Sequence, residues 1–229
     1  GPFFGNGMLN GWVDQHSGVL WTRLTKNPEM NRSGYKFLVP SAEEVRKLDK
    51  QADPAAVHKA QIPEGASLDM MEGACPGSPG EVNLVYFPAG QTEQKSETGW
   101  APVDTAKNFT FQWKLDQLIP GTTYQVKMYA RKNSGSAVTD SISGSFKTPP
   151  EEQAKREITF CIVTCHDYPR RDDSIGGHVI YRTMLQNWPD FFVHTGDVEY
   201  YDKPAPFALT EELMRFKWDR LLALPYERE

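Results

Sequence analysis

Two short apolar runs in the last third of the chain, separated by a helix-like segment, constrain the fold more than any other feature. Residues 158–164 and 191–195 are almost continuously apolar and rich in β-branched or aromatic residues, which is typical of strands buried on both faces. Between them, residues 177–188 carry apolar residues at helical spacing, and Pro189 ends the pattern. This succession of strand, helix and strand predicts a βαβ unit with parallel strands.

The loops that follow these two strands carry side chains that can bind a metal ion. Thr-Cys-His-Asp occupies residues 164–167, and Thr-Gly-Asp-Val-Glu-Tyr occupies residues 195–200. Ligands bind beyond the carboxyl ends of parallel strands in open α/β sheets, so we expect Cys165 and Asp197 to lie near each other. Gly196 allows the backbone to turn sharply before the carboxylate. Carboxylate and phenolate oxygens together with a thiolate indicate a metal site.

The first 148 residues have the pattern of an all-β domain. Strand-like runs bounded by turn formers occur at 18–24, 81–87, 108–115, 118–130 and 141–147. The phrase Leu-Ile-Pro-Gly-Thr-Thr-Tyr at 118–124 resembles the corner of a fibronectin type III domain, in which a tyrosine hydroxyl caps the turn before its strand. These runs predict a fibronectin type III-like β-sandwich.

Residues 40–80 interrupt the strand pattern of the sandwich. Ser41 is followed three residues later by Glu44, which is the arrangement of a capping box at the start of a helix. A second short helix is expected near residues 55–60. We therefore predict an insertion in the sandwich at about 40–80.

A proline-containing and charged segment at 149–157 separates the two parts of the chain. We divide the sequence into a sandwich domain at 1–148, this linker, and an α/β part at 158–229. The α/β part ends in an amphipathic helical pattern at 210–224 and offers no third strand. Because two parallel strands do not make a stable sheet by themselves, we expect the α/β domain to be truncated in this sequence.

Composition excludes several classes of partner. With 25 Lys and Arg against 30 Asp and Glu, the net charge is −5, and no basic tract provides a nucleic-acid surface. No apolar run approaches the roughly 20 residues of a transmembrane helix. The first residues lack the pattern of a signal peptide, although one could have been removed. Three cysteines, an odd number, do not predict a framework made of disulfides alone.

Four segments together resemble one family of enzymes. Gly-Asp at 196–197, after an apolar strand, resembles the second motif of the calcineurin-like metallophosphoesterases. The longer stretch 189–200 is similar to the alkaline phosphatase D (PhoD) family. Thr-Cys-His at 164–166 resembles the Ser-Cys-Gln of that family, where the cysteine replaces the usual Asp-x-His. Val-Leu-Trp-Thr-Arg at 19–23 matches a strand of the family's N-terminal fibronectin-like domain, so the resemblance covers nearly all of the chain except about 40–80.

The resemblance implies a fold and a set of metal ligands. The segment from residue 158 would be the start of an α/β calcineurin-like metallophosphoesterase domain, which is a four-layer αββα sandwich when complete. Cys165 and Tyr200 would be thiolate and phenolate ligands of Fe(III). Asp197 would bridge the iron and a second, divalent ion, commonly Ca²⁺ in this family, and would act in catalysis. The identity of the divalent ion is left open.

Three further side chains near Cys165 are candidates for contacting substrate or supporting the ligands. They are His166, Asp167 and Arg170. An arginine here would hold a phosphate, while a solvated turn is the alternative. His166 stands where the family usually has Gln, and Glu199 stands where it more often has Ile. Neither change removes an expected ligand.

The resemblance also implies an activity. The parent protein would hydrolyse phosphomonoesters, and often phosphodiesters, with a hydroxide that bridges the metals. It would act in the periplasm or outside the cell. The family's remaining ligands have no candidates in this sequence, so we expect the chain alone to be inactive and to depend on the remaining C-terminal part of the same protein. The competing hypothesis is a non-catalytic binding or structural module that retains a degenerate phosphatase remnant.

Overall fold

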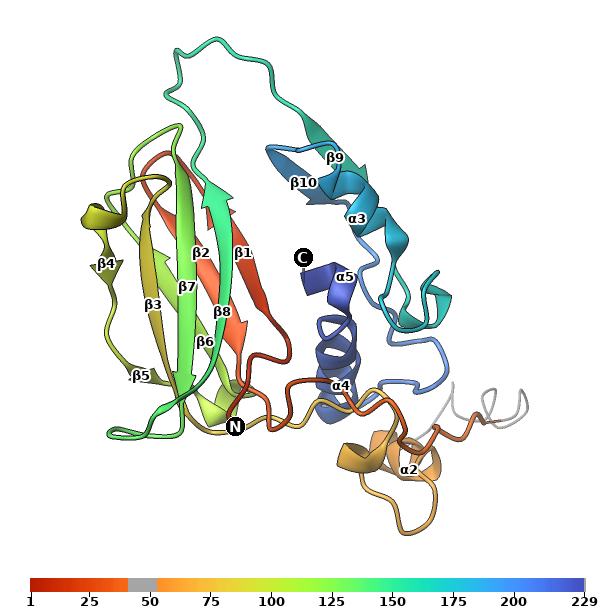
Figure 1. Cartoon of the computed structure of the whole chain (residues 1–229). Helices are drawn as coiled ribbons and strands as arrows, with labels where there is room; N and C mark the ends of the chain where they lie inside the picture. The colour runs from red at the N-terminus through yellow and green to blue at the C-terminus, as the bar shows by residue number, and fades with distance from the viewer. Residues whose placement is uncertain (41–52, 229) are drawn as a thin grey trace. The chain divides into compact units, whose positions relative to one another are not determined.

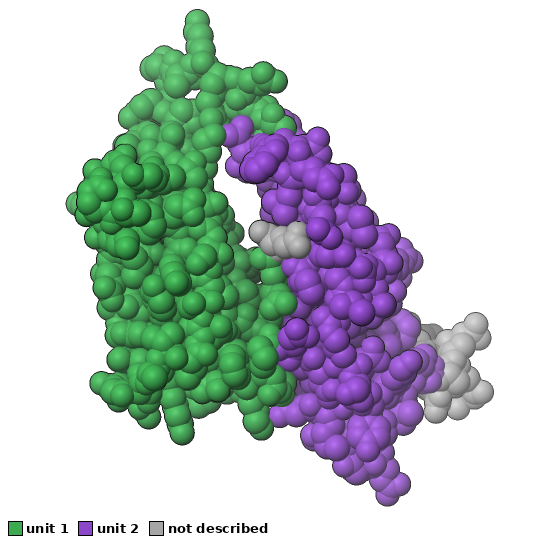
Figure 2. Space-filling view, viewed as in Figure 1, with its two compact units in different colours: residues 1–28, 76–159, 228 green, residues 29–75, 160–227, 229 purple. Residues whose placement is uncertain are grey.

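The computed structural model describes residues 1–40 and 53–228, and these divide into two compact units, coloured separately in Figure 2. Unit 1 consists of residues 1–28, 76–159 and 228. Unit 2 contains residues 29–75 and 160–227. The domain boundaries expected from sequence at 148 and 158 stay a prediction, and the structure adds that each unit combines stretches of chain that are separate in sequence.

Unit 1 contains two antiparallel sheets in the part that the structure describes. One has the order β1–β2–β6, and its strands are β1 (Met8–Val13), β2 (Gly18–Arg23) and β6 (Thr110–Leu115). The other has the order β4–β3–β7–β8, with β5 also paired to β3. Its strands are β3 (Glu81–Pro88), β4 (Ser96–Glu97), β5 (Ala101–Pro102), β7 (Thr123–Arg131) and β8 (Val138–Lys147), and Figure 1 shows β3, β7 and β8 side by side. Two short 3₁₀ helices, η2 (Thr92–Gln94) and η3 (Thr105–Lys107), lie in the connections.

The core of unit 1 joins side chains from both sheets, which confirms the predicted β-sandwich. Leu20 and Trp113 of the first sheet lie in one buried cluster with Leu84 and Met128 of the second. The predicted tyrosine corner is also present, because the Ile119 N–H donates to the Tyr124 hydroxyl at 2.9 Å. All five predicted strands form.

One long strand escaped the sequence analysis. β1 contains Asn10 and Gly11, which are poor strand formers, and its side chains are exposed or half-buried. It pairs with β2 along an edge of its sheet. Because it contributes few buried side chains, it leaves no alternating apolar pattern to detect.

Unit 2 mixes short helices with a pair of strands. Its elements are α2 (Pro54–Ala60), η1 (Leu68–Met70), β9 (Phe160–Val163), η4 (Tyr168–Arg170), α3 (Val179–Leu185), β10 (Phe191–His194), α4 (Glu211–Leu221) and α5 (Pro225–Arg228). β9 and β10 pair in parallel, with Val163 opposite His194. The predicted parallel βαβ unit is therefore confirmed, and Figure 1 shows the two strands side by side.

Residues 29–40 and 53–75 belong to unit 2, whereas the sequence led us to expect an insertion in the sandwich at about 40–80. Phe37 and Met71 share a buried cluster with Leu213 and Phe216 of α4. The rings of Phe37 and Phe216 lie 5.1 Å apart in an edge-to-face arrangement. The short helix expected near 55–60 is α2, and the capping-box helix expected at Ser41 lies outside the described residues.

The strands β9 and β10 are less buried than their apolar sequences predicted. Phe160, Ile162 and Phe192 are 51%, 63% and 52% exposed. Among the residues that the structure describes, this sheet has two strands, and α3 is seven residues long, so little surface is available to cover them. The predicted apolar face of α3 is likewise only partly buried, because Met184 is buried while Trp188 is 88% exposed.

The predicted amphipathic helix near the end of the sequence is α4. The Thr210 hydroxyl caps it by accepting from the Leu213 N–H, and Leu213 and Phe216 are buried. Lys217 is also buried on this helix, at 1% exposure. A cation in that position needs polar partners, and the next section describes them.

Candidate metal centre

The loops after β9 and β10 leave the sheet at the same edge. The Thr195 N–H donates to the Val163 carbonyl at 2.9 Å, which extends the parallel pairing to the last residues of both strands. Beyond it, the Cys165 N–H donates to the Gly196 carbonyl at 3.2 Å and the His166 N–H to the Asp197 carbonyl at 2.8 Å. The main chains of the two loops are therefore linked by hydrogen bonds.

Both loops turn through backbone conformations that side chains rarely adopt. Cys165 and Asp197 have φ values of 59° and 55°, and Gly196 between the strand and Asp197 has a φ of 122°. A left-handed conformation at a non-glycine residue costs about 1–3 kcal/mol and is found mainly where the surrounding structure or a function requires it. Here it turns the Cys165 and Asp197 side chains toward one another.

Cys165, Asp197 and Tyr200 converge on one carboxylate oxygen. The Cys165 Sγ lies 3.7 Å from Asp197 Oδ2, and the Tyr200 hydroxyl donates to the same oxygen at 2.9 Å. The hydrogen bond with Cys165, followed by that with Asp197, raises the pKa of Tyr200 and favours the phenol that donates to Asp197. The structure thus brings together all three residues that the resemblance implied as metal ligands.

The donor set is chemically unusual. The described residues contain no group of three or more His, Cys, Asp and Glu side chains placed to hold a metal ion. The convergence at Asp197 includes only two such side chains, and the third donor is a phenol. One thiol, one carboxylate and one phenol fit a metal that accepts both sulfur and hard oxygen ligands.

A histidine network lies against this centre. The Gly196 N–H donates to His194 Nδ1 at 3.3 Å, so the proton of His194 lies on Nε2, which donates to His166 Nδ1 at 3.0 Å. The Tyr181 hydroxyl also lies 2.8 Å from this His166 nitrogen. Burial, and then the charges of His178 and His194, lowers the pKa of His166 to about 4, which agrees with a neutral ring.

His166 and Asp167 are buried, while Arg170 is exposed. The Arg170 Nε lies 3.9 Å from Asp167 Oδ2, and the Arg170 side chain is 77% exposed. The other Asp167 oxygen is buried without a hydrogen-bond partner among the described residues. Of the three flanking candidates, Arg170 is therefore the one whose charged group can meet a solute.

Two functional candidates were missed because their partners are distant in sequence. His178 Nδ1 bonds to the Glu227 carboxylate, and His178 Nε2 lies 3.1 Å from the Asp167 carbonyl, which ties the Cys165 loop to α5. Burial alone would lower the pKa of His178, but the hydrogen bond and charge of Glu227 outweigh it and raise that pKa. No local pattern pairs residues that are 49 positions apart.

Glu199 and Lys217 are the other missed pair. Their charged groups lie 3.6 Å apart, and their side chains are 0% and 1% exposed. The signal that was available is a lysine within the amphipathic pattern at 210–224, whose buried residues also include the charged Asp219 and Arg220.

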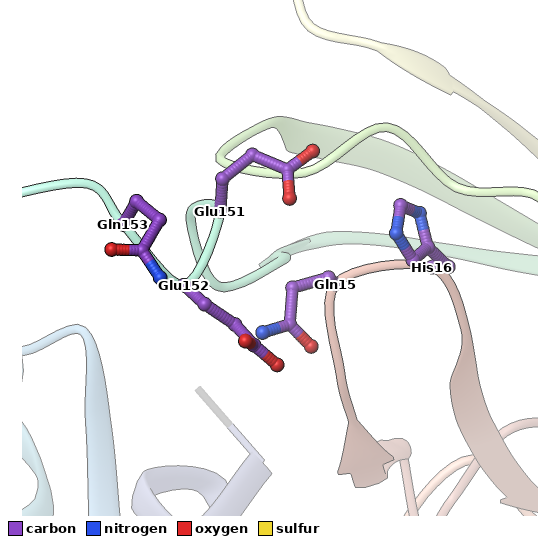
Figure 3. A pocket seen from close by; sticks show the side chains of 5 residues that line it. All are labelled: Gln15, His16, Glu151, Glu152 and Gln153. Atoms are coloured by element: carbon purple, nitrogen blue, oxygen red, sulfur yellow. The ribbon is translucent and has the colours of Figure 1, made fainter.

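A surface pocket in unit 1 contains none of the predicted site residues. It is lined by Gln15, His16, Glu151, Glu152 and Gln153, whose side chains appear in Figure 3. His16 Nδ1 lies 3.2 Å from the Leu118 carbonyl. The pocket therefore combines two carboxylates with a histidine already engaged by the main chain, and it does not resemble the convergence at Asp197.

None of the helices in the described residues is both long and apolar enough to cross a membrane.

Comparison with solved structures reveals one similarity over the whole chain. A structure of PhoD superposes with a TM-score of 0.60 at 17% identity, covering 99% of this chain and 36% of that one. At this identity the similarity shows a shared fold, and the chain spans little more than a third of the PhoD length. No protein-family model matches the sequence, and no curated protein matches it.

Two further similarities have lower TM-scores. A fibronectin type III domain from human KIAA0970 protein covers 67% of this chain, with a TM-score of 0.31 and 13% identity. It is covered to 80% of its own length. The sensor domain of the anti-sigma factor RsgI4 of Pseudobacteroides cellulosolvens covers 64%, with a TM-score of 0.33 and 14% identity, and is itself covered to 75%.

Proposed function

We propose that this chain is part of a metal-dependent phosphoric ester hydrolase of the alkaline phosphatase D type, which cleaves phosphomonoesters and often phosphodiesters. The observation that carries the proposal is the convergence of Cys165, Asp197 and Tyr200 at the carboxyl edge of two parallel strands. The fold shared with PhoD over 99% of the chain supports the same choice.

In this proposal Cys165, Tyr200 and Asp197 would hold Fe(III), and Asp197 would also serve a divalent ion such as Ca²⁺. The three donors fit this role because the Cys165 thiol and the Tyr200 phenol both contact the same carboxylate oxygen of Asp197. Bound metal ions supply the Lewis acidity that activates water and neutralises phosphoryl charge. The thiol and the phenol must lose their protons to bind, so metal binding releases protons.

The surrounding side chains hold this arrangement and receive the substrate. His194 accepts from the Gly196 N–H, which fixes the turn that presents Asp197. His166 orients His194 in turn, because its Nδ1 atom accepts a hydrogen bond from His194 Nε2. The exposed Arg170 guanidinium binds phosphate oxygens, since arginine matches them with two parallel hydrogen bonds, and Asp167 limits its orientation.

The proposal concerns a protein longer than the described unit 2. The chain spans 36% of the PhoD structure, so the complete activity requires further ligands. We propose that the remaining C-terminal part of the same protein supplies them, that this chain alone is inactive, and that the protein acts in the periplasm or outside the cell.

The test is metal analysis of the complete gene product, combined with turnover of p-nitrophenyl phosphate and bis-p-nitrophenyl phosphate. Cys165→Ala and Asp197→Asn should each lose iron. The turnover of both substrates should fall by about 100-fold or more, which is the effect expected when a catalytic group is removed. Cys161→Ala is the matched control, because Cys161 lies in β9, four residues before Cys165, and outside the convergence.

Retained iron and activity in both site variants would disprove the site assignment. A complete gene product that binds no metal and cleaves neither ester, although it is folded, would instead favour the non-catalytic binding or structural module.

A further inference from the structure

The Glu199–Lys217 ion pair is almost completely buried. The charged groups are 3.6 Å apart, and the side chains are 0% and 1% exposed. Removing two charges from water costs several kcal/mol, which their attraction repays only when further hydrogen bonds are made. The hydrogen bonds that Glu199 and Lys217 make with other groups therefore show which part of the chain the pair stabilises.

Both partners bind the main chain of Tyr200. The Tyr200 N–H donates to Glu199 Oε1 at 3.1 Å. The Lys217 ammonium donates to the Tyr200 carbonyl and, at 3.2 Å, to the Lys203 carbonyl. The peptide groups on both sides of the Tyr200 Cα are therefore held by one ion pair, while the Tyr200 phenol points to Asp197.

The pair itself is attached to a rigid element. Lys217 lies in α4 next to Phe216, whose ring packs on Phe37, and one turn after Leu213, which is fully buried. The second Glu199 oxygen is buried and has no hydrogen-bond partner among the described residues. The hydrogen bond and the close ion pair of the carboxylate are thus made with Tyr200 and Lys217, while Arg220 adds a second buried positive charge nearby.

We propose that the Glu199–Lys217 pair is a positioning device that fixes the main chain of Tyr200 so that its phenol oxygen meets Asp197 and Cys165 in the geometry of a metal ligand. This inference rests on the proposed function, because it gives Tyr200 the role of ligand. Groups that orient a metal ligand without touching the metal change metal affinity or activity by about 10–100-fold when they are removed.

The test uses the double variant Glu199→Gln/Lys217→Met in the complete gene product. Gln keeps an acceptor for the Tyr200 N–H and Met keeps the apolar volume of Lys217, so the variant removes one buried charge of each sign. The buried Arg220, which also interacts with the charge of Glu199, stays in place. The readouts are iron retention against a chelator and the visible charge-transfer absorption of an iron-bound phenolate. We expect iron affinity to fall about 10–100-fold and the absorption to weaken or shift.

The same substitutions in a Tyr200→Phe background separate positioning from general stability. If the pair acts through Tyr200, the double variant lowers iron affinity no further once the phenol is gone. A merely structural pair lowers it equally in both backgrounds, and this additivity would overturn the inference. Arg215→Met is the control, because Arg215 lies on the same helix in an exposed ion pair with Glu211 and should leave both readouts unchanged.

The outcomes also separate this inference from the proposed function. A wild-type protein without iron or phenolate absorption contradicts both. A wild-type protein that has them, with a folded double variant that matches it, contradicts the positioning role alone. If the double variant does not fold, Glu199→Asp keeps the ion pair and withdraws the carboxylate by one methylene from the Tyr200 N–H. Unchanged iron affinity in that variant would equally overturn the inference.

Discussion

The two units of this protein bury different kinds of side chain. Unit 1 has an apolar core in which Leu84 and Met128 of one sheet pack with Leu20 of the other. Its buried Arg23 donates to the Asn6 side chain and to Asn108, which are neutral groups. Unit 1 is therefore stabilised mainly by burial of apolar side chains, and the buried Arg23 guanidinium is hydrogen-bonded.

Unit 2 shows the opposite distribution around its strands. Apolar side chains of β9 and β10 such as Phe160 and Ile162 are half exposed or more, while Glu199, Lys217 and Asp167 are buried. Unit 2 also has apolar clusters, such as that of Phe37 with Leu213, so the difference is confined to the surroundings of its strands. Burying charge costs stability, and in our proposal the charges of Glu199 and Lys217 are retained because they position Tyr200.

The largest expected effect concerns the buried charge of unit 2. Lys217→Met alone leaves Glu199 buried without its cation, and breaking a buried pair in this way costs about 3–5 kcal/mol. Arg215→Met removes an exposed pair from the same helix and should cost at most about 1 kcal/mol. Urea unfolding of the two variants measures the contrast. If the two variants lost the same free energy of unfolding, burial of the Glu199–Lys217 pair would have no effect on stability. That result would contradict the contrast drawn between buried and exposed charge.

The next effect compares apolar side chains of the two units. Leu84→Ala empties part of a fully buried site in β3 and should cost about 2–5 kcal/mol. Ile162→Ala in β9 removes a side chain that is 63% exposed and should change stability by about 0.5 kcal/mol or less. The same unfolding experiment measures both in the complete gene product. A cost for Ile162→Ala as large as that for Leu84→Ala would show that β9 is covered there.

The smallest effect sharpens the comparison through pH. The pKa of His166 is lowered from 6.5 to about 4, so the folded protein keeps this ring neutral while the unfolded chain takes up a proton. Its contribution is complete above about pH 6.5 and is lost as the pH falls toward 4, with a slope of at most about 1.4 kcal/mol per pH unit. Unfolding free energies measured across this window should fall less steeply in His166→Gln. Parallel profiles for the two proteins would contradict a neutral, buried His166.

Much of the architecture was predictable because it depends on local patterns. The alternating residues 124–130 predict a half-buried strand, and the apolar runs at 158–164 and 191–195 predict parallel strands joined by a helix. The carboxyl ends of parallel strands meet at one edge, so the proximity of Cys165 and Asp197 also followed. These inferences need only residue type and spacing.

Other features were not predictable, for physical reasons that differ from case to case. The placement of residues 29–75 in unit 2 depends on contacts such as that of Phe37 with Phe216, which no local pattern specifies. The expected burial of β9 and β10 was read from composition, but burial depends on what lies against a strand as well as on its sequence. The role of Tyr200 as a ligand came from a family resemblance, and it stays a prediction.

The sequence by itself determined which residues stand at the ends of the two strands and why Gly196 is needed before Asp197, because local backbone geometry follows from residue type. Only the tertiary structure decided that Glu199 and Lys217 form hydrogen bonds with the Tyr200 main chain, and that His178 forms one with Glu227. Hydrogen-bonded ion pairs need close contact between groups that the chain brings together from distant positions. Its partners therefore become visible only once the chain is folded.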